Sequence, residues 1–202
     1  MAEQYFTHNP TTEHAIKKFD FELRNQEFHF STDNSVFSKQ RVDFGTTVLI
    51  NSIDYSDLVS GPILDLGCGY GPIGLVLAKQ MPKRTVDMVD VNERALELAK
   101  RNAQANQISN VNIFSSDVYQ NITNNYAAIY TNPPIRAGKK VVNSILAGAY
   151  EYLLPNGQLW VVVQKKQGES SCKKLMNQTF GNVEIVERSK GYYILKSVKT
   201  EN

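Results

Sequence analysis

The sequence is short of cysteine and has no long apolar run, and both absences exclude classes of protein. Its two cysteines, Cys68 and Cys172, are too few for a disulfide framework and are typical of a reducing compartment. No apolar stretch approaches the roughly 20 residues that span a bilayer. The opening residues, MAEQYFTHNP, lack the basic flank and apolar run of a signal peptide. We therefore expect a soluble, cytoplasmic protein with no membrane contact.

Histidine is also scarce, and nothing divides the chain into domains. His8, His14 and His29 lie far in sequence from the motifs described below, and no metal site is predicted. The chain of 202 residues has no internal repeat, low-complexity tract or Pro/Gly/Ser-rich linker. At roughly 150 residues per domain, we predict a single domain over 1–202. Apolar residues make up 42% and charged residues 21%, which argues against disorder.

The formal net charge of +2 is unevenly distributed along the chain. Residues 1–60 carry nine acidic and five basic side chains, whereas residues 164–200 carry eight basic and three acidic ones. A basic segment on a nearly neutral protein can bind the phosphates of a nucleic acid. An ordinary solvated lysine-rich face explains the same asymmetry. Both interpretations stay open at this point.

The order of the predicted elements indicates an α/β fold. Lys18 to Phe30 alternates apolar and polar residues around a predicted Asn25-Gln26 turn, which is typical of a β-hairpin. A helix is expected over Val42–Ile53. Short apolar runs then alternate with helical segments, as parallel βαβ units do. The predicted strands are 63–66, 85–91, 111–114, 127–130 and 159–163, and the predicted helices are 71–80, 93–106 and 139–153.

The last part of the chain has a different pattern. A helix over 169–180 precedes two apolar runs, 183–187 and 192–198. The Lys190-Gly191 break between these runs is short enough only for an antiparallel hairpin. We therefore predict a Rossmann-like seven-stranded sheet with a terminal antiparallel hairpin, preceded by an N-terminal β-hairpin.

A glycine-rich loop separates the first apolar run of this sheet from the next helix. Its Gly69-x-Gly71-x-x-Gly74 pattern matches the dinucleotide-binding fingerprint, so an NAD enzyme is a competing interpretation. Asp65 argues against it because a carboxylate repels pyrophosphate, and Pro72 removes a backbone N–H from the helix start. A carboxylate suits the cationic amino-acid part of S-adenosylmethionine instead.

Acidic residues follow three successive apolar runs. We expect Asp65 to contact the α-ammonium group of the cofactor, Asp90 both ribose hydroxyls, and Asp117 the adenine amine. Each acid alone could cap a helix or turn, but ligands of open α/β sheets bind at these strand ends. The predicted cofactor-binding set is Asp65, Gly67, Gly69, Gly71, Asp90, Val91, Asp117, Val118 and Asn132. The combination resembles the class I S-adenosylmethionine-dependent methyltransferases over residues 36–200.

The tetrapeptide Asn132-Pro133-Pro134-Ile135 follows the fourth apolar run and is the predicted catalytic motif. Two prolines hold the loop extended and remove two backbone donors, although such a pair could also simply end a strand. The Asn132 side-chain oxygen and the Pro133 carbonyl can then accept the two N–H bonds of an amine. These two contacts would direct the nitrogen lone pair at a methyl group. Among the class I enzymes that the chain resembles, an Asn-Pro-Pro tetrapeptide marks N-methyltransferases.

The segments 36–46 (VFSKQRVDFGT) and 132–139 (NPPIRAGK) resemble the ribosomal RNA small-subunit methyltransferase C family. The resemblance implies methyl transfer to the exocyclic amine (N2) of a guanine, with ribosomal RNA or the small-subunit particle as partner. The chain resembles the catalytic half of the two-domain family members. The resemblance divides 1–202 into an N-terminal hairpin extension, 1–35, and a methyltransferase core, 36–200.

The same resemblance implies further site residues. Phe37 and Ser38 border the cofactor pocket, with a core position as the alternative for Phe37. Ile135 stands where the family usually has phenylalanine, so the identity of the methylated base stays open. Methylation of adenine or protein glutamine, and RNA binding without catalysis, are the alternatives to guanine methylation. The residues expected to contact substrate RNA are Lys39, Arg136, Lys139 and Lys140.

Overall fold

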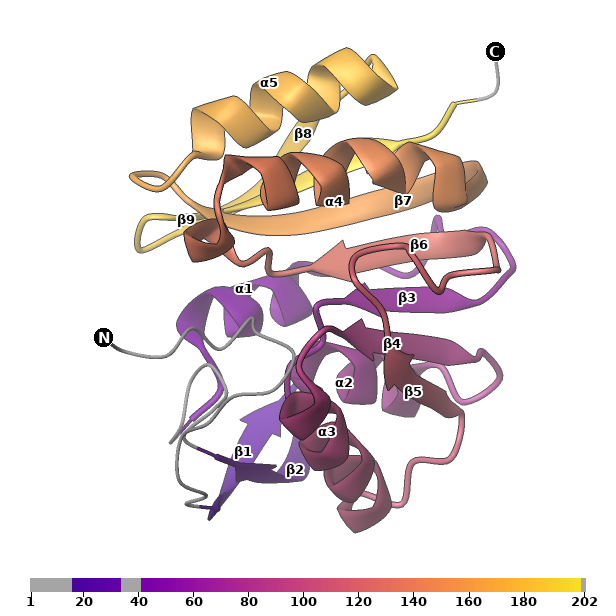
Figure 1. Ribbon diagram of the computed structural model, residues 1–202, viewed down its shortest axis with the longest axis vertical. Helices are drawn as coiled ribbons and strands as arrows, with labels where there is room; N and C mark the ends of the chain where they lie inside the picture. The colour runs from indigo at the N-terminus through magenta and orange to yellow at the C-terminus, as the bar shows by residue number, and fades with distance from the viewer. Residues whose placement is uncertain (1–15, 34–40, 201–202) are drawn as a thin grey trace.

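The computed structural model describes residues 16–33 and 41–200, in which strands and helices alternate (Figure 1). The strands are β1 Lys17–Leu23, β2 Gln26–Thr32, β3 Ile63–Leu66, β4 Val86–Asp90, β5 Val111–Ser115, β6 Tyr126–Thr131, β7 Leu153–Gln164, β8 Glu184–Ser189 and β9 Tyr192–Val198. The helices are α1 Phe44–Ser52, α2 Pro72–Gln80, α3 Glu93–Ala105, η1 Ile135–Ala137 (a 3-10 turn), α4 Lys139–Tyr152 and α5 Glu169–Phe180.

One seven-stranded sheet forms the centre of the molecule, in the order β5-β4-β3-β6-β7-β9-β8. The strands from β5 to β7 in this order are parallel neighbours, whereas β9 is antiparallel to both β7 and β8. Strands β1 and β2 form a separate antiparallel hairpin. The predicted fold class is therefore confirmed, including its terminal and N-terminal hairpins.

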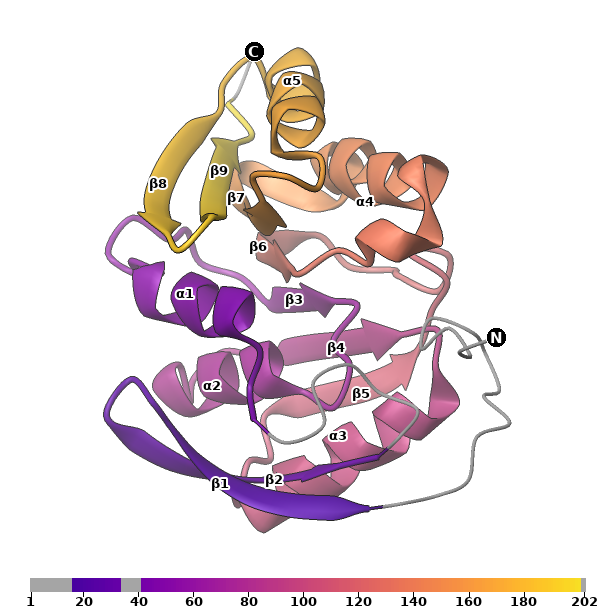
Figure 2. The ribbon, with the colours of Figure 1, turned by 90° about the vertical axis from the view of Figure 1, so that its left-hand side faces the viewer.

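Different helices cover the two faces of the sheet (Figure 2). Helices α1, α2 and α3 pack on one face together with the β1–β2 hairpin, and α4 and α5 pack on the other. Successive strand residues point to opposite faces. Ile63 and Met88 thus belong to the core beneath the first group, while Leu64 and Val89 belong to the core beneath the second.

Most elements differ from the prediction by one or two residues at their ends, and two differences change the strand pairing. The N-terminal hairpin turns at Arg24 and Asn25, with φ of +50° and +59°, one residue earlier than predicted. Two-residue hairpin loops favour positive φ at both positions, and this turn pairs buried Leu23 with Gln26. Strand β7 begins at Leu153 rather than 159, because Leu153 already pairs with Tyr126 of β6. The division between an extension and a core at residue 35 falls outside the described residues and stays a prediction.

The strand order changes direction at β3, because the strands that follow it in sequence lie on both of its sides. Strand β4 pairs with one side of β3, and β6 pairs with the other. In open α/β sheets, ligands bind in the crevice outside the carboxyl ends of the strands at such a point. None of the helices in the described part of the chain is long and apolar enough to cross a bilayer.

Candidate active site

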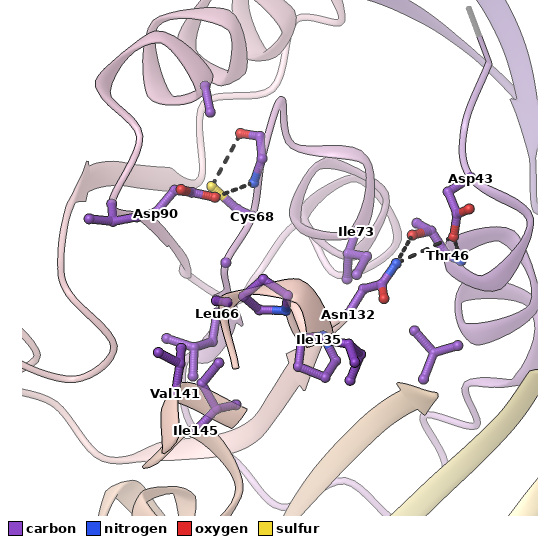
Figure 3. Close-up of a pocket in the computed structure, with 18 of the residues that line it drawn as sticks. Asp43, Thr46, Leu66, Cys68, Ile73, Asp90, Asn132, Ile135, Val141 and Ile145 are labelled. Carbon is purple, nitrogen blue, oxygen red and sulfur yellow. Dashed lines mark hydrogen bonds between the residues drawn. The ribbon is translucent and has the colours of Figure 1, made fainter. Parts of the chain in front are cut away.

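The carboxyl ends of the parallel strands open into a cavity of about 530 Å³. Its wall is formed by the loops after β3, β4, β5 and β6, the end of β7, the start of β9 and the start of α1 (Figure 3). The predicted site residues that line it are Gly67, Gly69, Asp90, Val91, Asp117, Val118, Asn132, Pro133, Pro134, Ile135 and Arg136. The predicted cofactor acids and the predicted catalytic motif thus share one cavity.

The glycine loop between β3 and α2 presents bare backbone to this cavity. Gly67 and Gly69 adopt φ of +75° and +57°, and no atom lies within 4 Å of where a Cβ would stand. The loop is held from below, because the Gly67 and Cys68 N–H groups both donate to the Val89 carbonyl, at 2.8 and 2.9 Å. Glycine adopts this conformation without steric cost, so a ligand can approach the backbone closely here.

Asp65 lies beneath the glycine loop and not on the cavity wall. Its Oδ2 accepts the Gly74 N–H at 2.7 Å, and its Oδ1 has no hydrogen-bond partner among the described residues. Complete burial raises the pKa of this carboxyl to about 7; the Gly74 bond opposes the rise and Asp90 adds to it. Gly71 also lies off the wall, where an added Cβ would stand 2.8 Å from Met88. Direct contact of Asp65 with the cofactor stays a prediction.

Asp90, the last residue of β4, is held by two backbone donors. The Gly69 N–H donates to its Oδ2 and the Asn92 N–H to its Oδ1, each at 2.9 Å. Burial raises the pKa of Asp90, and the backbone bonds oppose that rise. Each carboxylate oxygen can accept more than one hydrogen bond. Asp90 can therefore still accept a pair of hydroxyls from the cavity.

The loop after β5 adds an exposed carboxylate and a strained backbone. Asp117 is exposed at the cavity wall. Val118 has φ of +51°, which is unusual for a β-branched residue. Ser116 holds this conformation, since its hydroxyl donates to the Val118 carbonyl at 2.9 Å and accepts the Asn121 N–H at 3.1 Å. Strained residues of this kind concentrate at ligand sites, in keeping with the predicted adenine contact.

Asn132 follows the end of β6 and presents only an acceptor to the cavity. Its Nδ2 donates to Thr46 Oγ1 at 3.0 Å and to Asp43 Oδ2 at 3.3 Å. Its Oδ1 points away from both partners (Figure 3), and none of the described residues donates to it. The preceding Thr131 anchors the loop, because its hydroxyl donates to the Leu66 carbonyl at 2.8 Å.

Residues from late in the chain complete the wall beside α1. Gln164 of β7 and Tyr192 of β9 are cross-strand partners, and Gln164 Nε2 donates to the Tyr192 hydroxyl at 2.6 Å. The Tyr192 ring packs edge-on against Phe44, and an added Cβ at Gly45 would stand 2.5 Å from it. Glycine at 45 therefore makes this contact possible. Since the Tyr192 hydroxyl accepts from Gln164, it keeps its own proton to donate.

The predicted RNA-binding residues are only partly described. Arg136 of η1 lines the cavity, and exposed Lys139 and Lys140 begin α4. Cations in a first helical turn oppose the helix dipole, so an anionic ligand explains their position better than helix stability does. Phe37, Ser38 and Lys39 lie outside the described residues. Within the described residues, no group of His, Cys, Asp and Glu side chains could hold a metal ion.

Several polar residues of the wall were not predicted from the sequence, among them Asp43, Thr46, Gln164 and Tyr192. Asp43 and Thr46 lie in the segment that carries the family resemblance, and their i, i+3 spacing at a helix start was the available signal. Nothing local marks Gln164 or Tyr192, because only the pairing of β7 with β9 brings them together.

Comparison with known proteins supports the methyltransferase interpretation. The family model described as "Methyltransferase small domain" matches residues 27–196. The protein named "Uncharacterized protein YbxB" of Bacillus subtilis (strain 168) is 48% identical over 201 residues, covering 98% of this chain and 100% of that protein. Ribosomal RNA small subunit methyltransferase C of Psychromonas ingrahamii is 30% identical over 187 residues, covering 91% of this chain. The alignment includes only 52% of that relative, so this chain spans about half its length.

Solved structures show the same fold. The "T. Thermophilus 16S rRNA N2 G1207 methyltransferase (RsmC) in complex with AdoMet and Guanosine" matches with a TM-score of 0.83 at 23% identity, covering 94% of this chain and 52% of that one. A methyltransferase from Pyrococcus furiosus matches with a TM-score of 0.64 at 21% identity, covering 76% and 81%. The predicted resemblance is therefore confirmed, and the chain belongs to the methyltransferase small domain family.

Proposed function

We propose that the protein uses S-adenosylmethionine to methylate N2 of a guanine in small-subunit ribosomal RNA. One observation carries the proposal: Asn132, whose amide oxygen accepts no hydrogen bond from the described residues, lines the same cavity of about 530 Å³ as Asp90 and the glycine loop. An amine held by Asn132 and a methyl donor held by Asp90 would thus meet in one cavity, and such proximity is a large part of catalysis.

The cavity fits S-adenosylmethionine. Asp90 would accept the ribose hydroxyls, and Asp117 on the same cavity wall would accept from the adenine amine. The bare backbone at Gly67 and Gly69 leaves room for the amino-acid part, and Asp65 below it would attract a cation in its ionised form. The bound cofactor supplies an electrophilic methyl group.

The chain's own residues would orient the acceptor. The lone pair of an exocyclic amine is conjugated with the ring, which makes the nitrogen a weak nucleophile. Asn132 Oδ1 and the Pro133 carbonyl would accept its two N–H bonds, favour a pyramidal nitrogen and aim the lone pair into the cavity. This is orientation with electrostatic stabilisation, and it needs no covalent enzyme intermediate.

The RNA assignment rests on relatives and on surface charge. Relatives about 30% identical over most of this chain are named ribosomal RNA small subunit methyltransferase C, and exposed Arg136, Lys139 and Lys140 are suited to phosphates. The Tyr192 hydroxyl can donate to a carbonyl oxygen, which guanine has at O6 and where adenine has an amine. We propose that ribosomal RNA or the small-subunit particle is the partner and the cytoplasm the location.

Methylation of adenine or of protein glutamine is the second candidate. Ile135 does not separate it from the first candidate, because this side chain packs against the apolar cluster under α4 and cannot stack on any planar substrate as an aromatic residue would. Adenine and glutamine each present an NH2 group as the methyl acceptor, so Asn132 and Pro133 would orient either of them in the same way as guanine.

Nucleoside mass spectrometry of ribosomal RNA from a deletion strain tests the proposal. We expect N2-methylguanosine in the small-subunit RNA to fall by one residue per ribosome and to return on complementation. Loss of a methylated adenosine, or of methylglutamine from a ribosomal protein, would establish the second candidate instead. No change in any of these would contradict both.

A further inference from the structure

The amide of Asn132 is held in one of its two possible orientations. A side-chain amide can rotate by about 180°, which exchanges its oxygen and its NH2 group, and its hydrogen-bond partners decide between the two positions. Asn132 donates both N–H bonds toward α1, one to Thr46 Oγ1 at 3.0 Å and one to Asp43 Oδ2 at 3.3 Å (Figure 3). Its acceptor oxygen is thereby left on the cavity side.

We propose that Asp43 and Thr46 are positioning residues for methyl transfer, which fix Asn132 with its oxygen toward the reacting amine. A carboxylate oxygen only accepts hydrogen bonds. If the amide rotated, its own oxygen would face Asp43 Oδ2 and its NH2 would face the substrate N–H bonds. Both contacts would then be repulsive. This inference rests on the proposed role of Asn132 as the amine acceptor.

The positioning residues are themselves held in place. Asp43 is the N-cap of α1, and its Oδ2 accepts the Thr46 N–H at 3.1 Å. Its carbonyl accepts both the Thr47 N–H at 2.9 Å and the Thr47 hydroxyl at 3.0 Å. Thr46 is buried. The same Asp43 oxygen therefore starts the helix and receives the Asn132 amide, so the helix N-terminus sets the position of the acceptor.

The hydrogen bonds of Asn132 with Asp43 and Thr46 join residues that are far apart in the sequence. Asp43 and Asn132 are 89 residues apart, and Thr46 and Asn132 are 86 apart. Helix α1 is fixed independently by its contacts with the end of the chain, since Phe44 packs on Tyr192. The acceptor is thus oriented by a rigid element and not by its own loop, and rigid support is what keeps such groups in productive geometry.

Paired substitutions separate this role from helix capping. Serine and asparagine are both good N-caps, but only asparagine keeps an acceptor long enough to reach Asn132. Likewise, Thr46→Ser keeps the hydroxyl and Thr46→Val removes it. We expect Asp43→Ser combined with Thr46→Val to lower kcat by about 10- to 100-fold, as displaced catalytic groups do, with little change in KM for RNA. The conservative pair, Asp43→Asn and Thr46→Ser, should retain much more of the activity.

The assay uses small-subunit ribosomal RNA purified from a strain that lacks the gene, with S-adenosylmethionine as the methyl donor. Thr47→Val is the matched control, because Thr47 bonds to Asp43 but does not reach Asn132. In an Asn132→Ala background, the double substitution should change kcat by no more than about 2-fold, since residues that act through one group do not add. A full further loss in that background, or full activity of the double variant, would overturn the proposal.

A second readout does not depend on the substrate. The side-chain NH2 protons of Asn132, assigned by their loss in Asn132→Ala, should exchange slowly with water in the wild type and faster in the double variant. Unchanged exchange would refute the positioning role. If the wild type transfers no methyl group to this RNA while the exchange result holds, the proposed function fails and the orientation of Asn132 stands.

Discussion

At the scale of single residues, the site depends on carboxylates that lie under or beside the glycine loop. Asp65 lies in β3 and Asp90 ends the neighbouring strand β4, and the charge of Asp90 adds to the rise in the pKa of Asp65. Asp65 is fully buried with one unpaired oxygen, whereas both oxygens of Asp90 receive backbone N–H bonds. Both acids were predicted to contact the cofactor because both lie at strand ends. In the structure only Asp90 lines the cavity, and Asp65 is buried beneath the glycine loop.

The raised pKa of Asp65, about 7, predicts a pH dependence of stability. An ordinary aspartate in the unfolded chain titrates near 3.9, so between about pH 4 and pH 7 the folded state binds a proton that the unfolded state has lost. The free energy of unfolding should therefore fall as the pH rises through this window and level off above about pH 7. Urea unfolding of the wild type and Asp65→Asn from pH 4.5 to 8 measures the difference. Parallel curves would mean that Asp65 does not titrate in this range.

Asp90→Ala should weaken the binding of S-adenosylmethionine by about 1.5–3 kcal/mol, the range for hydrogen bonds to a charged group. The substitution also frees the Gly69 N–H, which Asp90 now holds at 2.9 Å. Titration calorimetry of the folded variant measures the affinity, with circular dichroism as the control for folding. Unchanged affinity would remove Asp90 from the cofactor site.

At the scale of elements, the N-terminus of α4 carries exposed Lys139 and Lys140 between two residues of the cavity wall, Ala137 and Val141. Replacing Lys139 and Lys140 by glutamine should weaken RNA binding, flatten its salt dependence by about one to two units of slope and leave cofactor affinity unchanged. The matched control is the same replacement of Lys173 and Lys174 on α5, because no residue of α5 lines the cavity, whereas Val141 and Ile145 of α4 do. Equal effects of the two pairs, or no change of slope at Lys139 and Lys140, would place the RNA elsewhere.

Most of the strands and helices could be predicted from the sequence, whereas a turn position and a long-range contact could not. Alternating and continuous apolar runs predicted every strand of the sheet, because burial on one or both faces leaves a local pattern. The hairpin turn at Arg24 and Asn25 was missed by one residue, since backbone φ decides it and polarity does not. The contacts of Asn132 with Asp43 and Thr46 could not be predicted, because they join α1 to the end of β6.

At the scale of the whole molecule, one sheet brings distant segments to one cavity. The glycine loop after β3, the acids after β4 and β5 and the Asn-Pro-Pro-Ile loop after β6 meet because parallel strands end at the same edge. That part was predictable from the order of strands and motifs. Tyr192 and Gln164 were not, since the position of the terminal hairpin beside α1 depends on tertiary packing.

The central claim is that Asn132 orients a guanine amine for methyl transfer. It is tested by measuring N2-methylguanosine, by mass spectrometry, in small-subunit ribosomal RNA incubated with S-adenosylmethionine and purified protein. We predict that the wild type forms it and that Asn132→Ala forms it about 10²- to 10³-fold more slowly, at nearly unchanged cofactor affinity. A rate within 2- to 3-fold of the wild type in Asn132→Ala, or a methylated product on another base, would contradict the account.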